Sequence, residues 1–198
     1  MLRKPFVSVL LAGAALAGSA SAWAHGNFGA DTSIWTASTH LFTSPLSLAA
    51  LIGLALVLFG IREPLSVLAA ALAAAAAVVA TAFSAHIPAV VAPAAVVVIG
   101  FSAVAGWRPS AAFSLLLALL AGLATGSAAD LEQPRWQELT GMAVTVMVCA
   151  FWLLAVSDNL NRSGRFQTLI PLARRVLGSW VAAIALLLGA LALVAKNT

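Results

Sequence analysis

The chain has 198 residues, of which 63% are hydrophobic and only 8% are charged, and its mean hydropathy is +1.06. Soluble domains need a polar surface and carry about 25% charged residues. The composition therefore excludes a soluble enzyme, a nucleic-acid-binding module and a disordered chain. It predicts an all-α, polytopic membrane protein, in which the formal net charge of +4 reports orientation rather than a nucleic-acid partner.

The first 24 residues follow the pattern of a signal peptide. Two positive residues precede an apolar run over 7–18, and Ala22-Trp23-Ala24 supplies a small-x-small cleavage site. Ala20-Ser21-Ala22 is an alternative site two residues earlier. We expect cleavage after residue 24, which makes His25 the mature N-terminus on the outer face of the membrane. The alternative is an uncleaved anchor helix.

Six apolar stretches follow a short exported segment over 25–43. Each is close to the ~20 residues that a ~30 Å hydrocarbon core requires, so residues 44–198 are predicted to form a six-helix transmembrane domain. The second stretch is mostly alanine, and we expect it to pack inside the bundle. The predicted helices cover 44–61, 65–84, 89–106, 110–128, 137–157 and 172–195.

Arginines set the predicted orientation. With the mature N-terminus outside, the outside segments hold only Arg135 and Lys196, whereas six arginines fall inside, as the positive-inside rule requires. We therefore predict a multi-pass protein of the bacterial inner membrane with both termini outside. The inside arginines are Arg62, Arg108, Arg162, Arg165, Arg174 and Arg175.

The longest polar loop is predicted over 157–171, on the cytoplasmic side. Its positive charge suits the anionic headgroups of the lipid bilayer, and docking of a membrane or cytosolic protein partner is the alternative.

Polar groups near the centres of the predicted spans are hydroxyls, among them Thr81 and Thr125. We expect them to bond to nearby backbone carbonyls or to a neighbouring helix. Gly122 and Gly126 form a G-x-x-x-G pair, which lets two helix backbones approach closely and predicts a helix contact within the bundle. No nucleophile–base set, phosphate loop or H-E-x-x-H motif is present in the sequence, so we do not expect an enzyme.

The candidate metal ligands all fall on the predicted outer face: His25, His40, His86 and Asp31. Imidazole binds nickel, copper and zinc well, and cleavage would place an amine and an imidazole together on His25. The alternative is that these histidines are solvated or structural. No resident cofactor is expected, only a transient divalent metal such as nickel.

The layout resembles the HupE/UreJ family. The stretch from His40 to Leu51 reads HLFTSPLSLAAL, and His40 falls on a histidine of the family, which also has a following proline and then an Asp-His pair. Leu46 and Ser47 stand in place of that pair. A second patch covers 98–130, where TGSAAD stands in place of the family's His-Gly-x-Ala-His-Gly motif.

The resemblance implies a six-helix fold and a role as a permease or accessory protein for a metal such as nickel, which serves hydrogenase and urease. The competing hypothesis is a non-transporting membrane scaffold or assembly factor. The absence of strong ligands within the spans favours the second, and the family association favours the first.

Overall fold

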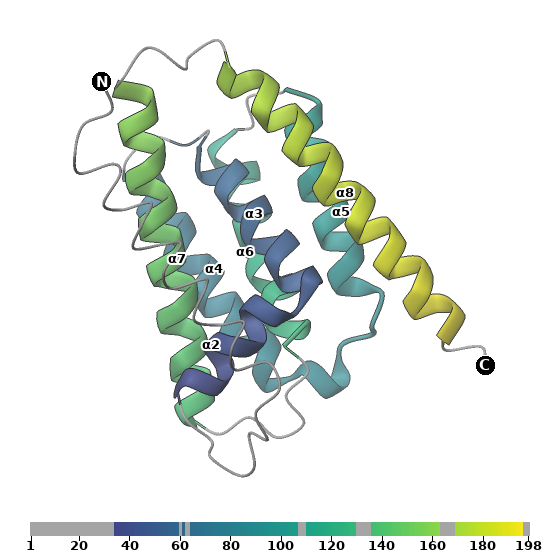
Figure 1. The fold of residues 1–198 in the computed structure, drawn as a ribbon. Helices are drawn as coiled ribbons and strands as arrows, with labels where there is room; N and C mark the ends of the chain where they lie inside the picture. Colours follow the sequence, from purple (N-terminus) through teal and green to yellow (C-terminus); the bar gives the residue numbers. More distant parts are fainter. Residues whose placement is uncertain are drawn as a thin grey trace. The chain divides into compact units, whose positions relative to one another are not determined.

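The computed structural model describes residues 34–59, 61, 64–106, 110–129, 136–162 and 169–195. These residues form only helices and their connections, which confirms the all-α class (Figure 1). The predicted signal peptide, His25 and Asp31 lie outside the described residues. The α-helices are α2 (Ile34–Thr43), α3 (Pro45–Leu58), α4 (Leu65–Ala82), α5 (Val91–Val104), α6 (Ala111–Ser127), α7 (Trp136–Arg162) and α8 (Leu169–Ala195), and a short 3-10 helix covers Ser84–His86.

Three of these helices, α4, α7 and α8, are long and apolar enough to cross a membrane. The helices α3, α5 and α6 are also apolar but have only 14, 14 and 17 residues. All six apolar helices lie where the hydropathy pattern predicts them. Local chemistry fixes two of their starts, because the Ser44 and Ser110 hydroxyls accept hydrogen bonds from the backbone N–H groups of Ser47 and Phe113, as N-cap residues do.

Two segments differ from the prediction. Helix α2 lies within the segment 25–43, for which we expected no helix. The prediction of a polar loop over 157–171 is wrong at both ends of that range. Helix α7 continues to Arg162, and α8 begins at Leu169. Polar residues mark the depth at which a helix leaves an apolar layer, but they do not end the helix. At 1.5 Å per residue, the 27 residues of α7 extend about 40 Å.

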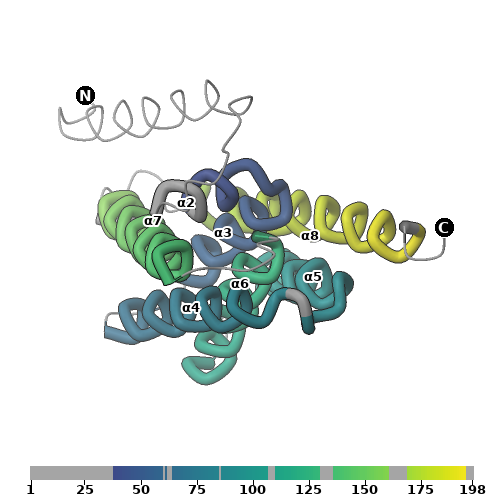
Figure 2. The backbone as a smooth tube through the Cα atoms, turned by 90° about the horizontal axis from the view of Figure 1, so that it is seen from below, coloured from purple at the N-terminus to yellow at the C-terminus, as the bar shows by residue number. Residues whose placement is uncertain are grey.

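The most extensive helix contact within the unit formed by residues 32–198 is the one between α4 and α6. A Cβ on Gly122 would overlap the carbonyl oxygen of Ala73, and one on Gly126 would overlap that of Ala77. The G-x-x-x-G pair thus packs inside the bundle on the alanine-rich helix, and both predictions are confirmed. In Figure 2, α6 lies between α4 and α5.

The helices α7 and α8 lie at the periphery of this unit. Helix α7 packs on α2, α3 and α4, whereas α8 packs mainly on α5 and α3. The α5–α8 contact is a second small-residue seam, in which Gly100 and Gly178 face each other: a Cβ on Gly100 would lie 2.7 Å from the Gly178 carbonyl oxygen. Ala103 and Ala182 complete the seam.

Hydrogen bonds identify which helix ends meet. The Ser47 hydroxyl at the start of α3 donates to the Thr125 carbonyl over 3.4 Å, and the Thr81 hydroxyl at the end of α4 donates to the Gly126 carbonyl over 3.2 Å. The start of α3 and the ends of α4 and α6 therefore share one end of the bundle (Figure 1). The start of α8 lies at the other end, beside the end of α5, where Arg175 meets Gly106.

Candidate functional site

Three hydroxyls in α4, α5 and α6 donate to backbone carbonyls. Thr125 donates to the Ala121 carbonyl over 2.7 Å, Thr81 to the Ala77 carbonyl over 2.8 Å, and Ser102 to the Ile99 carbonyl over 2.7 Å. The predicted bonding of these hydroxyls is confirmed. Thr125 and Ser102 each donate to a carbonyl of their own helix, and Thr81 shares its proton between Ala77 in its own helix and Gly126 in α6.

The candidate metal ligands are placed only in part. His40 lies in the last turn of α2 and His86 in the short 3-10 helix, and both side chains are exposed. Both lie at the bundle end where α3 starts and α4 ends. His25 and Asp31 lie outside the described residues, and in the described part of the chain no three His, Cys, Asp or Glu side chains form a group that could hold a metal.

A cleft of about 350 Å³ opens at the opposite end of the bundle. Ser66 in the first turn of α4 and Ser157 in α7 are buried there, 1% and 6% exposed. Within the described part of the chain, the Ser66 hydroxyl has no hydrogen-bond partner. The only sequence signal for this cleft is a pair of serines at helix ends. The cleft is lined by Leu58, Ile61, Ser66, Val67, Phe151, Leu154, Ala155, Ser157 and Asp158.

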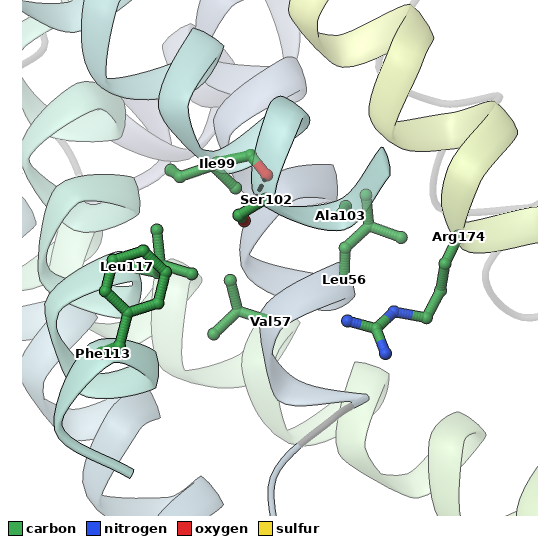
Figure 3. A pocket seen from close by; sticks show the side chains of 8 residues that line it. All are labelled: Leu56, Val57, Ile99, Ser102, Ala103, Phe113, Leu117 and Arg174. Atoms are coloured by element: carbon green, nitrogen blue, oxygen red, sulfur yellow. Dashed lines mark hydrogen bonds between the residues drawn. The ribbon is translucent and has the colours of Figure 1, made fainter. Parts of the chain in front are cut away.

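Arg174 reaches into a second, small cavity at this same end (Figure 3). Its volume of about 10 Å³ is near that of one water molecule. The Nε atom of Arg174 is buried and has no hydrogen-bond partner among the residues that the structure describes. The cavity is lined by Leu56, Val57, Ile99, Ser102, Ala103, Phe113, Leu117 and Arg174.

The arginine pattern predicts that Arg174 lies in an inside loop. It does not predict that the side chain enters a cavity within the bundle. Arg174 lies in the second turn of α8, and its neighbours come from α3, α5 and α6. An arginine pair at 174–175 next to an apolar run was the available signal, but the pattern does not reveal which helices surround it.

The chain has no match among known protein families, curated proteins or solved structures. What the site can do must therefore be argued from its own residues.

Proposed function

We propose that this chain is a six-span inner-membrane protein of HupE/UreJ type that acts as a scaffold or assembly factor and does not transport metal. The observation that carries this proposal is the close packing of α4 against α6. The glycines of α6 lie against the backbone of α4, and the buried hydroxyls beside them bond to backbone carbonyls. A pathway for an ion normally keeps polar or charged side chains at membrane depth, and neither α4 nor α6 carries a charged residue or a histidine.

The six-span topology is supported by helix length and charge. Helices α3, α5 and α6 extend about 21 to 26 Å at 1.5 Å per residue, and a short span is accommodated by local thinning of the bilayer or by snorkelling of flanking residues. Arg162, Arg174 and Arg175 share the end of the bundle that the positive-inside rule assigns to the cytoplasm.

Metal handling at the outer face is the second candidate function. It is favoured by His40 and His86, which share the opposite end of the bundle. His25 and Asp31 are predicted to lie on the same side of the membrane. Two or three imidazoles with a carboxylate would suit a borderline divalent ion.

Nickel uptake and metal binding separate these two functions. Full-length protein is reconstituted into liposomes for uptake of Ni²⁺, and the detergent-solubilised protein is titrated with Ni²⁺, Cu²⁺ and Zn²⁺ by calorimetry. The scaffold proposal expects uptake equal to that of empty liposomes, and saturable uptake would overturn it. Binding that is lost in the His40→Ala, His86→Ala double variant, but kept in a Thr140→Ala control from the same end, would support the second candidate.

The scaffold proposal also expects a partner at the cytoplasmic end. Asn159 is exposed near the end of α7, within the segment 157–171 for which docking of a protein partner is the alternative to lipid contact. A photo-crosslinking residue placed there should yield a discrete protein adduct in intact cells, whereas the same residue at Ala89, which is exposed at the opposite end, should not. The absence of any adduct from position 159 would count against a partner at this end.

A further inference from the structure

Arg174 carries its charge into apolar surroundings. Its side chain is half-buried, and the cavity that it enters is lined by six hydrophobic residues and Ser102. Its Nε–H has no acceptor in the described ranges of the chain. The Ser102 hydroxyl donates to a backbone carbonyl. In Figure 3 the guanidinium points toward Leu56 and Val57. Burying a charge without an acceptor costs free energy. An anion bound at this end of the bundle would reduce that cost for Arg174.

Arg175 extends this positive charge to the surface. Its side chain is exposed, and its guanidinium lies over the end of α5. The Arg175 Nη2 and Nε atoms lie 2.9 and 3.3 Å from the point that a Cβ on Gly106 would occupy. Gly106 has a φ of +64°, which is a conformation that glycine adopts readily. A glycine here therefore both ends α5 and leaves the space that Arg175 occupies.

Large apolar side chains are exposed on the two helices of this seam. Leu172 and Val176 on α8 and Phe101 on α5 are large hydrophobic residues that are 48–60% exposed. Among the described residues, no carboxylate forms an ion pair with Arg174 or Arg175. Two guanidinium groups beside an exposed apolar surface match a ligand that has a phosphate group attached to hydrocarbon chains.

We propose that Arg174 and Arg175, at the end of the α5–α8 seam, bind the phosphate group of an anionic phospholipid whose acyl chains lie along Phe101, Leu172 and Val176. Arginine binds phosphate through paired, charge-assisted hydrogen bonds, and basic pockets between membrane helices on the cytoplasmic side hold anionic headgroups. The proposal rests on the membrane placement given under Proposed function. It does not depend on whether the protein acts as a scaffold or handles metal.

The test uses the purified full-length chain in detergent. Phosphatidylglycerol and phosphatidylcholine with the same acyl chains are titrated separately, and binding is followed by native mass spectrometry and by the shift in melting temperature. We expect phosphatidylglycerol to bind and to raise the melting temperature. We expect Arg175→Gln to weaken its binding about tenfold, the Arg174→Gln, Arg175→Gln double variant to abolish it, and Arg162→Gln, a matched loss of one charge at the same end, to leave it unchanged.

Three results would overturn the proposal: equal binding of the two lipids, unchanged phosphatidylglycerol binding in Arg175→Gln, or an equal melting-temperature shift from inorganic phosphate alone. The last result would identify a soluble phosphate site instead of a lipid site. If the double variant does not fold, as judged by circular dichroism, Arg175→Gln decides the question because that side chain is exposed. Binding in detergent depends on neither orientation nor a protein partner, so failure here is distinguishable from failure of the proposed function.

Discussion

Gly126 has no space for a side chain, because a Cβ would overlap the carbonyl oxygen of Ala77. We predict that Gly126→Ala separates α4 from α6 and lowers the free energy of unfolding by about 1–3 kcal/mol, the usual cost of overpacking. Unfolding in SDS, followed by circular dichroism, measures this loss. Gly189→Ala is the control, since its Cβ would lie 3.2 Å from the Pro93 Cβ and only a small shift is needed. Equal losses in the two variants would contradict the close approach of α4 and α6.

Gly106 is constrained by its backbone rather than by the bundle centre. With a φ of +64°, an alanine at this position costs about 1 kcal/mol, and its Cβ would also displace the Arg175 guanidinium. We predict that Gly106→Ala lowers the free energy of unfolding by about that amount and weakens phosphatidylglycerol binding as well. The same unfolding and lipid titrations measure both effects. A variant with unchanged lipid affinity would show that the position of Arg175 does not depend on Gly106.

At the scale of elements, a hydrogen bond joins α2 to α7. The hydroxyls of Ser38 and Thr145 lie 2.7 Å apart, and Thr145 also donates to the Gly141 carbonyl over 2.7 Å. We predict a coupling of about 0.6 kcal/mol between Ser38→Ala and Thr145→Val, which is typical of hydroxyl pairs in membrane helices. A double-mutant cycle of unfolding free energies measures it. Replacing Thr145→Val by Thr140→Val in the cycle should give no coupling, because the Thr140 hydroxyl donates to Trp136 in its own helix.

Hydropathy predicted the six apolar helices because their composition changes sharply at each loop. It missed α2, whose residues 34–43 include Ser38 and several threonines, residues that compete with the helix backbone for hydrogen bonds in isolation. Packing against α7 overrides that local preference. The hydropathy pattern also predicted that α7 ends at residue 157, where polar residues return. The helix continues beyond that point to Arg162.

The candidate site was predicted less well than the fold. The sequence predicts that His40 and His86 share one face of the membrane, because two predicted spans separate them in the chain. It could not place Arg174 in a cavity, because that requires knowing that α3, α5 and α6 surround the start of α8. The G-x-x-x-G spacing predicted that Gly126 packs closely against another helix. It could not identify Ala77 as the partner, because the alanine run of α4 offers many equivalent positions.

For the whole molecule, the arginine distribution predicts which bundle end faces the cytoplasm. We predict that a cysteine replacing Ala89 reacts with an impermeant thiol reagent in intact cells, and that one replacing Asn159 reacts only after the inner membrane is opened. Both positions are exposed, and the background is Cys149→Ala, which removes the native cysteine. Labelling of position 159 in intact cells would reverse the proposed orientation.

The seam between Gly100 and Gly178 joins helices whose contact points are about 80 residues apart in the chain. At a synthesis rate of roughly 5–20 residues per second, α5 waits about 4 to 16 seconds before the matching part of α8 leaves the ribosome. During that interval in the proposed membrane arrangement, the face of α5 that carries Gly100 and Ala103 is covered only by lipid or by a transient neighbour. The contact between α5 and α8 can therefore form only after the matching part of α8 has been synthesised.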